Sequence, residues 1–87
     1  MIKVKRRNRN EFLVVVDEKD SRTQHVVTLD EEYYRRFAGK GISKERLIER
    51  SFRFLLAREP KESILRRFNL KVISNYFPEY EKTMQTS

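Results

Sequence analysis

The chain has 87 residues, which favours a single small domain, and it holds no cysteine and only one histidine. This composition excludes disulfides and thiolate metal sites, and it leaves too few ligands for an all-protein zinc site or a Ser-His-Asp triad. With 20 Lys+Arg against 13 Asp+Glu, the net charge of +7 favours polyanionic partners: DNA, RNA or an acidic protein surface. We expect no enzyme activity, no cofactor and no metal.

The expected location is the cytoplasm. No apolar run approaches the roughly 18 residues of a membrane span, and no leader-type apolar stretch follows the basic start of the chain. Strand-like segments come first and helix-like segments follow, which predicts the α+β class. We expect one domain over residues 1–81 and a loose polar tail over residues 82–87.

Three strand-like segments open the chain. Residues 2–5 alternate between apolar side chains and lysines, as in an edge strand guarded by charge. The run Phe12–Val16 is continuously apolar and predicts a central strand that is covered on both faces. After a polar turn, residues 23–29 alternate again. The N-terminal third is therefore predicted to be an antiparallel β-hairpin or a three-stranded meander.

Three to four short helices are predicted to follow. Asp30 caps the first, which Gly39 stops, and Ser43 caps a longer amphipathic helix. Pro60 suits the first position of a third helix, whose inward residues would include Leu65. Residues 70–77 fit a last helix, but their β-branched side chains leave a strand open as an alternative. The sequence also leaves open whether this last segment is packed or displayed.

Positive charge is concentrated in residues 1–10, which contain no acidic side chain. The phosphate groups of a nucleic-acid backbone would neutralise cations that have no acidic side chains beside them. The sequence therefore predicts nucleic-acid contacts for this basic arm; the alternative is that the arm only keeps a small protein soluble. The predicted contacts are Lys3, Lys5, Arg6, Arg7 and Arg9.

A second group of basic residues lies on the predicted amphipathic helix. Arg46, Arg50 and Arg53 fall within a narrow sector opposite its apolar face, where they can follow one phosphate backbone. The commoner outcome for such a stripe is a solvated face, in which Glu49 pairs with Arg53 one turn later.

Single polar and aromatic residues have simpler interpretations. His25 shares a face with Val27 and Leu29, which favours a hydrogen-bonded histidine at the edge of the core over a ligand or a general base. Tyr76 and Phe77 are spaced as on a helix, which is more typical of core residues than of a stacking surface for single-stranded bases.

The window from Gln24 to Glu59 holds a short alternating strand, an acid-opened helix, a Gly-Ile-Ser turn and an amphipathic helix. It resembles the ribbon-helix-helix class of DNA-binding proteins, in which two chains pair their strands into a ribbon that enters the major groove. The resemblance implies a homodimer whose outward strand residues read bases and whose second helix holds a phosphate at its start. The corresponding residues are Gln24, Val26, Thr28, Ser43 and Lys44.

The segment from Ser51 to Glu81, SFRFLLAREPKESILRRFNLKVISNYFPEYE, resembles the C-terminal part of a group of small bacterial proteins that carry no assigned activity. This resemblance implies a bacterial origin and a settled fold. It implies no catalytic residue.

Two functional hypotheses follow. The first is a non-catalytic nucleic-acid-binding homodimer, which the ribbon-helix-helix resemblance would sharpen to a transcriptional regulator or an antitoxin. The alternative is a protein-interaction or regulatory adaptor that docks on a larger bacterial assembly through an exposed strand edge or the C-terminal aromatic helix. Exposed aromatic side chains among Tyr76, Phe77 and Tyr80 would favour the adaptor, and a cationic ribbon at a two-fold axis would favour DNA.

Overall fold

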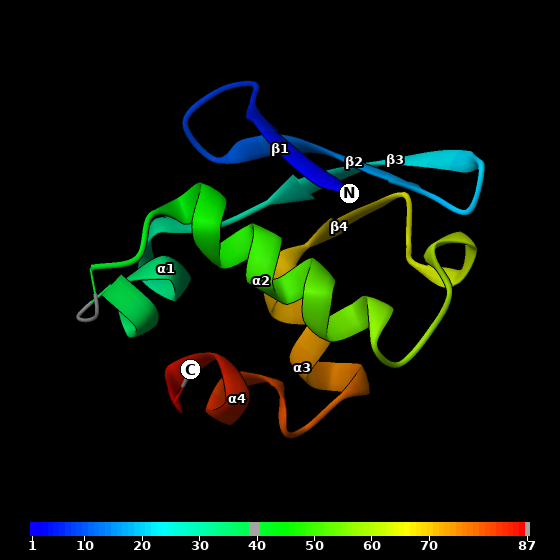
Figure 1. Cartoon of the computed structure of the whole chain (residues 1–87). Helices are drawn as coiled ribbons and strands as arrows, with labels where there is room; N and C mark the ends of the chain where they lie inside the picture. Colours follow the sequence, from blue (N-terminus) through cyan, green and yellow to red (C-terminus); the bar gives the residue numbers. More distant parts are fainter. Residues whose placement is uncertain (39–40, 87) are drawn as a thin grey trace.

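The computed structural model describes residues 1–38 and 41–86 and has an α+β fold, as predicted (Figure 1). Strands β1 (Ile2–Arg6), β2 (Glu11–Glu18) and β3 (Ser21–Thr28) form the predicted antiparallel meander. A fourth strand, β4 (Arg67–Asn69), adds to β3 in parallel, so the order in the sheet is β1-β2-β3-β4. The helices all lie on one side of this sheet (Figure 1).

The β2–β3 hairpin is closed by a two-residue turn. Lys19 and Asp20 both have positive φ, 55° and 62°, which matches the type I′ geometry that suits the twist of two antiparallel strands. The turn fixes the register, in which Glu18 lies opposite Ser21 and Val14 lies opposite His25. Side chains therefore alternate in step on the two strands.

Two helices connect β3 to β4. Helix α1 (Glu31–Ala38) begins with acidic side chains and ends with basic ones, which complements the helix dipole. Helix α2 (Lys44–Leu56) is capped as expected by Ser43, whose hydroxyl accepts a hydrogen bond of 3.0 Å from the Arg46 backbone N–H. Gly39, expected to stop the first helix, lies outside the described residues.

The helix predicted to start at Pro60 is absent from the described chain. A 3₁₀ turn, η1 (Lys61–Ser63), comes first, and the backbone then extends into β4. The Val26 N–H donates to the Arg66 carbonyl at 2.8 Å, and Phe68 lies opposite Val27 in the sheet. Pairing with β3 satisfies these backbone groups and buries Phe68, which a surface helix would not do.

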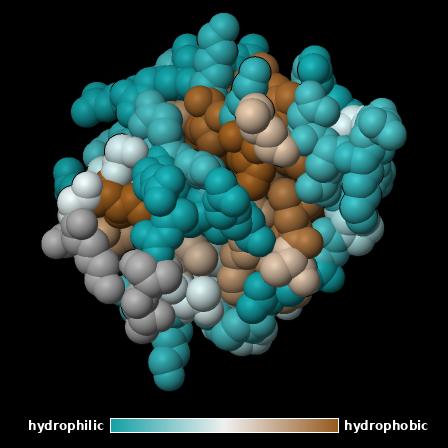
Figure 2. Space-filling view, viewed as in Figure 1, coloured by the Kyte–Doolittle hydropathy of each residue, from teal (hydrophilic) through white to brown (hydrophobic). Residues whose placement is uncertain are grey.

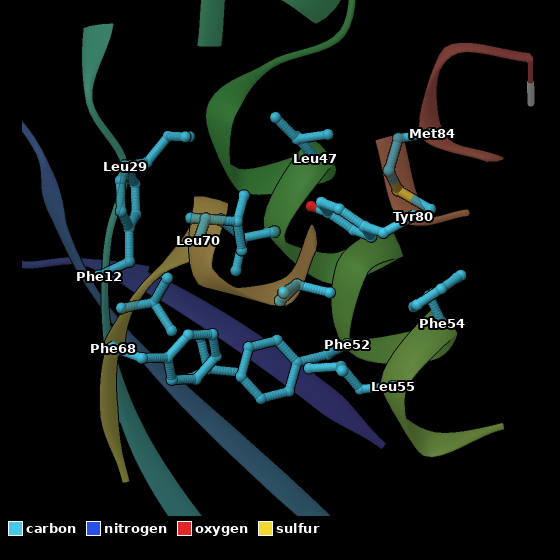
Figure 3. Close-up of a cluster of buried hydrophobic side chains, with 14 of the residues drawn as sticks. Phe12, Leu29, Leu47, Phe52, Phe54, Leu55, Phe68, Leu70, Tyr80 and Met84 are labelled. Atoms are coloured by element: carbon cyan, nitrogen blue, oxygen red, sulfur yellow. The ribbon is translucent and has the colours of Figure 1, made fainter. Parts of the chain in front are cut away.

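The C-terminal segment is helical and packed. A 3₁₀ turn, η2 (Leu70–Val72), leads into α3 (Ile73–Tyr76), so residues 70–77 are a short helix rather than a strand. Helix α4 (Tyr80–Thr86) then runs through the region where we expected a loose tail from residue 82. Tyr80 is fully buried and bonds to Ser51 of α2, and Met84 packs beside it (Figure 3).

The core lies between the helices and one face of the sheet. Phe12, Phe52 and Phe68 meet there with aliphatic side chains from α2 and η2 (Figure 3). The run Phe12–Val16 is covered on this face only: its first, third and fifth residues are buried, and Leu13 and Val15 are half-buried on the other face. Within residues 1–38 and 41–86 no helix lies over that second face, so the expected cover on both faces is wrong (Figure 1).

Candidate binding surfaces

The uncovered face of the sheet is a first candidate surface, which we call the open sheet face. The strand register aligns Lys5, Leu13, Val26 and Arg67 across all four strands. A second row across three strands joins Lys3, Val15 and Gln24. The centre of the open sheet face is therefore a small aliphatic patch, and its edges carry cations. It is made of Lys3, Lys5, Leu13, Val15, Arg22, Gln24, Val26, Thr28 and Arg67, with Glu11 and Asp17 beside them.

Ion pairs neutralise only part of the charge on the open sheet face. Arg22 pairs with Asp17 at 3.1 Å, and Arg67 lies 3.8 Å from Glu11. Lys3 and Lys5 are exposed and form no ion pair with any acidic residue that the structure describes. These two lysines are the members of the predicted basic arm that are free to bind an anion on the open sheet face.

The other basic residues of the arm differ in position. Arg6 turns toward α2 and pairs with Glu45 at 3.3 Å, whereas Arg7 pairs with Glu11 beside the open sheet face at 3.6 Å. Arg9 is exposed in the β1–β2 loop, where its backbone carbonyl accepts a hydrogen bond from Lys44. The predicted cations of the arm are therefore divided between the two sides of the sheet.

At the start of α2, the side chains of the predicted phosphate contacts Ser43 and Lys44 have partners within the chain. The Ser43 hydroxyl is occupied by the backbone of its own helix, and the Lys44 side chain is only 10% exposed. The Lys44 ammonium donates to a Glu31 carboxylate oxygen at 2.6 Å and lies over the Tyr34 ring. The hydrogen bond from Lys44 lowers the pKa of Glu31. Lys44 therefore joins α1 to α2, a structural role.

The arginine stripe on α2 is a solvated face, as the commoner outcome predicted. Glu49 lies between two of its arginines, 3.4 Å from Arg46 and 2.8 Å from Arg53. The hydrogen bond from Arg53 is the main reason that the pKa of Glu49 is lowered. Arg50 is half-buried on the same helix.

The strand of the ribbon-helix-helix resemblance has β2 on one edge and β4 on part of the other. Gln24, Val26 and Thr28 do share the open sheet face, as the resemblance implies. However, β3 pairs along its whole length with β2, and Val26, Val27 and Thr28 pair on the other edge with β4. A ribbon with a second copy that includes Val26–Thr28 would have to displace β4.

An apolar groove at the C-terminal end of α2 is a second candidate surface. Its volume is about 140 Å³. Leu65 and Tyr76, 49% and 66% exposed, lie at this groove; with Met1 they are the exposed large hydrophobic residues of the described chain. The lining residues are Leu55, Glu59, Ser63, Ile64, Leu65, Phe68, Val72, Ile73, Tyr76 and Phe77. We call this surface the apolar groove.

His25 holds one side of the apolar groove in place. Its Nδ1 lies 2.8 Å from the Leu65 carbonyl oxygen, and its Nε2 lies 2.9 Å from the Thr23 hydroxyl. Since a carbonyl only accepts, Nδ1 donates to it, and Nε2 of the neutral ring accepts from Thr23. Burial lowers the pKa of His25 and favours this neutral form. The predicted hydrogen-bonded histidine at the core is confirmed.

The sequence did not identify Leu65 as a surface residue. We placed Leu65 on the inner face of a helix starting at Pro60, but the chain is extended at that point and Leu65 lies outside the core. A usable signal was the sequence Ile64-Leu65, because adjacent apolar residues in an extended segment point to opposite sides. Tyr76 was predicted as core and is exposed, whereas Tyr80 is buried.

The described residues include no group of three or more His, Cys, Asp or Glu side chains that is able to hold a metal ion. None of their helices combines the length and the apolar character needed to cross a membrane. Comparisons with protein-family models, with curated proteins and with solved structures gave no match for this chain.

Proposed function

We propose that the chain is a non-catalytic protein-interaction module and that its apolar groove binds an apolar segment of a protein partner. The observation that carries this proposal is the exposure of Leu65 and Tyr76 at one hydrophobic depression. Contiguous exposed apolar surface is uncommon on small proteins unless it binds something. The cytoplasmic location and the larger bacterial assembly expected from the sequence belong to this proposal.

The groove is built to receive a single anchoring side chain. Its lining includes Leu55, Phe68 and Ile73, which are buried parts of the core. An apolar cavity of about 150 Å³ is large enough to hold a benzene ring, so a groove of about 140 Å³ has room for one aromatic or branched side chain. Glu59 and Ser63 add polar groups to the lining, which suits the backbone of a bound segment.

Site-specific photocrosslinking tests this proposal. A photoreactive phenylalanine analogue replaces Tyr76 in one sample and Tyr34, which is half-buried next to Ile42, in a matched control. In cell extract the probe at position 76 is expected to give discrete protein adducts that the control lacks. Changing Leu65 to Asp in the same chain should abolish them, because a carboxylate in the groove opposes burial of an apolar group. Identical adduct patterns at the two positions would contradict the proposal.

A second candidate function is polyanion binding on the open sheet face, favoured by the free cations Lys3 and Lys5. The open sheet face has no aromatic residue, so we expect phosphate contacts without base stacking. Two phosphate contacts would weaken binding to duplex DNA by about tenfold between 50 and 200 mM salt. Fluorescence anisotropy with random-sequence DNA and RNA measures this.

Variants of the protein show whether the open sheet face is the surface that binds the polyanion. Replacing Lys3 and Lys5 by Ala should remove the salt-dependent binding, whereas replacing Arg35, an exposed cation on α1, should not. No binding at 50 mM salt would remove this candidate and leave the groove as the functional surface.

A further inference from the structure

The outer edge of the sheet at β1 has unpaired backbone groups. The Asp17 N–H donates to the Met1 carbonyl and the Arg7 N–H donates to the Glu11 carbonyl, both at 2.8 Å. Because antiparallel pairing alternates, the odd-numbered residues of β1 turn their backbone groups toward β2. Ile2, Val4 and Arg6 therefore direct their N–H and C=O groups outward, where the described chain supplies no strand.

Beneath this edge lies a shallow depression with an apolar side. Its apolar side consists of Met1 and Ile2 from the start of the sheet and Leu56 and Ala57 from the end of α2, and Glu18, Glu49 and Arg53 complete the lining. Glu49 is paired with Arg53, and helix α2 packs against β1, the edge strand. Figure 2, viewed as Figure 1, shows apolar surface near the centre of this side of the molecule, bordered by hydrophilic side chains.

Above the edge, on the open sheet face, Lys3 and Lys5 are the nearest side chains. An added strand would place alternate side chains on the two sides of the sheet. Those on one side would meet the apolar depression, and those on the other would meet two unpaired ammonium groups. Charge complementarity therefore selects a strand in which apolar residues alternate with acidic ones.

A second copy of this chain does not meet that requirement. In each antiparallel register that pairs at least two outward residues of one β1 strand with those of another, a lysine lies opposite a lysine: Lys3 with Lys5, Lys3 with Lys3, or Lys5 with Lys5. Like charges directly opposite each other destabilise a strand pair.

We propose that the β1 edge binds an extended acidic segment of a protein partner, which adds to the sheet as a fifth strand. Backbone hydrogen bonds to Ile2, Val4 and Arg6 would supply affinity, and Lys3 and Lys5 would select the acidic sequence. This site goes beyond the proposed function, since the apolar groove and the depression under β1 share no lining residue.

The probe is a blocked octapeptide that alternates Glu and Val. One control is the same peptide with Lys in place of Glu. The other is the Glu peptide N-methylated at the alternate residues whose N–H groups would face β1. The Glu peptide is expected to bind. The Lys peptide should bind at least about tenfold more weakly, because its lysines repel Lys3 and Lys5. The methylated peptide should lose binding, because it lacks half of its backbone hydrogen-bond donors. Equal affinity for the three peptides, or no binding of any, would overturn the proposal.

Variants of the protein locate the site. Val4→Pro removes an outward N–H and leaves the β1–β2 hydrogen bonds intact, since proline is tolerated on an edge strand where the N–H faces solvent. It should lower affinity for the Glu peptide about tenfold, as should Lys5→Glu. Arg35→Glu, an equal charge change at an exposed residue of α1, is the matched control and should leave affinity unchanged. If Val4→Pro fails to fold, Lys5→Glu and Arg35→Glu decide the question alone.

Backbone amide chemical shifts separate this site from the apolar groove. Binding at the edge should shift the amide signals of Ile2–Arg6 and leave those of Leu65 and Tyr76 unchanged. Shifts confined to Leu65 and Tyr76 would place the peptide in the groove, which would overturn the edge site and leave the proposed function standing.

Discussion

His25 links the core to the apolar groove through two hydrogen bonds, and the one that Nε2 accepts depends on a neutral ring. Nδ1 donates to Leu65 and Nε2 accepts from Thr23. The ring also packs against Phe52, whose own ring packs against Phe68 in the groove lining. A second proton on His25 would place a charge in this buried site, close to the positive charge of Arg66. The folded state therefore disfavours protonation of His25.

We predict that stability falls as the pH drops below about 6.5, the unfolded-state pKa of histidine. Burial lowers the pKa of His25 in the folded state, so between the two pKa values the unfolded chain binds more protons. The stability that neutral His25 contributes is complete above the unfolded-state pKa. It decreases between the two pKa values by at most about 1.4 kcal/mol per pH unit. Urea unfolding at pH 5, 6, 7 and 8 measures it.

The control for this prediction is His25→Gln, which lacks the titrating group and should give a flatter profile over the same range. Glu31 and Glu49 do not interfere, because their folded-state pKa values are lowered from 4.5 and the stability that they contribute is lost as the pH falls below that value. Equal slopes for the wild type and His25→Gln would contradict the prediction.

At the scale of elements, local signals located the meander and the first two helices. Alternation, one continuous apolar run and the cap at Ser43 are properties of neighbouring residues, so the sequence carries them. β4 has only three residues, and its position depends on the edge of β3, some forty residues earlier in the chain. Helix α4 has only Tyr80 and Met84 to bury, four residues apart in a polar segment, and their packing on α2 is again a long-range contact.

The candidate sites also divide into features set by neighbouring residues and features set by contacts between distant segments. The lysines of the open sheet face were predictable from alternation in β1, whereas the ion pairs of Arg6 and Lys44 with residues of other elements were not. The apolar groove was missed because Leu65 and Tyr76 come from segments whose shape is set by β4 and α3. Contacts between distant segments thus determine which charges are free and which apolar side chains are exposed.

Helix α4 gives a test at this scale. Tyr80→Ala should reduce the free energy of unfolding by about 3–5 kcal/mol, because it removes a fully buried aromatic ring between α2 and α4. Tyr76→Ala, at an exposed tyrosine four residues earlier, should change it by less than about 0.5 kcal/mol. Denaturant titration of the two variants measures the difference. A similar effect of both substitutions would mean that Tyr80 does not hold α4 in place.

At the scale of the whole molecule, charge and exposed backbone meet at β1. The sheet has helices on one face, and its edge at β1 has free hydrogen-bonding groups, a combination that exposes it to pairing with other strands (Figure 1). Lys3 and Lys5 oppose pairing of this edge with a second copy, because each antiparallel register that pairs at least two outward residues of β1 with those of another β1 places lysines opposite each other. A homodimer through β3 would compete with β4 for Val26–Thr28, and a homodimer through β1 would meet this repulsion.

We therefore predict a monomer in solution and a gain of self-association in the single variant Lys3→Glu. In the register centred on Val4, this substitution replaces two Lys–Lys contacts with two Glu–Lys contacts. The double variant Lys3→Glu with Lys5→Glu restores like charges across the same pair of strands and should return to the monomer. Sedimentation equilibrium at low salt compares the three proteins, since screening at high salt weakens both attraction and repulsion. A stable wild-type dimer, or equal self-association of the single and double variants, would show that these lysines do not control pairing at β1.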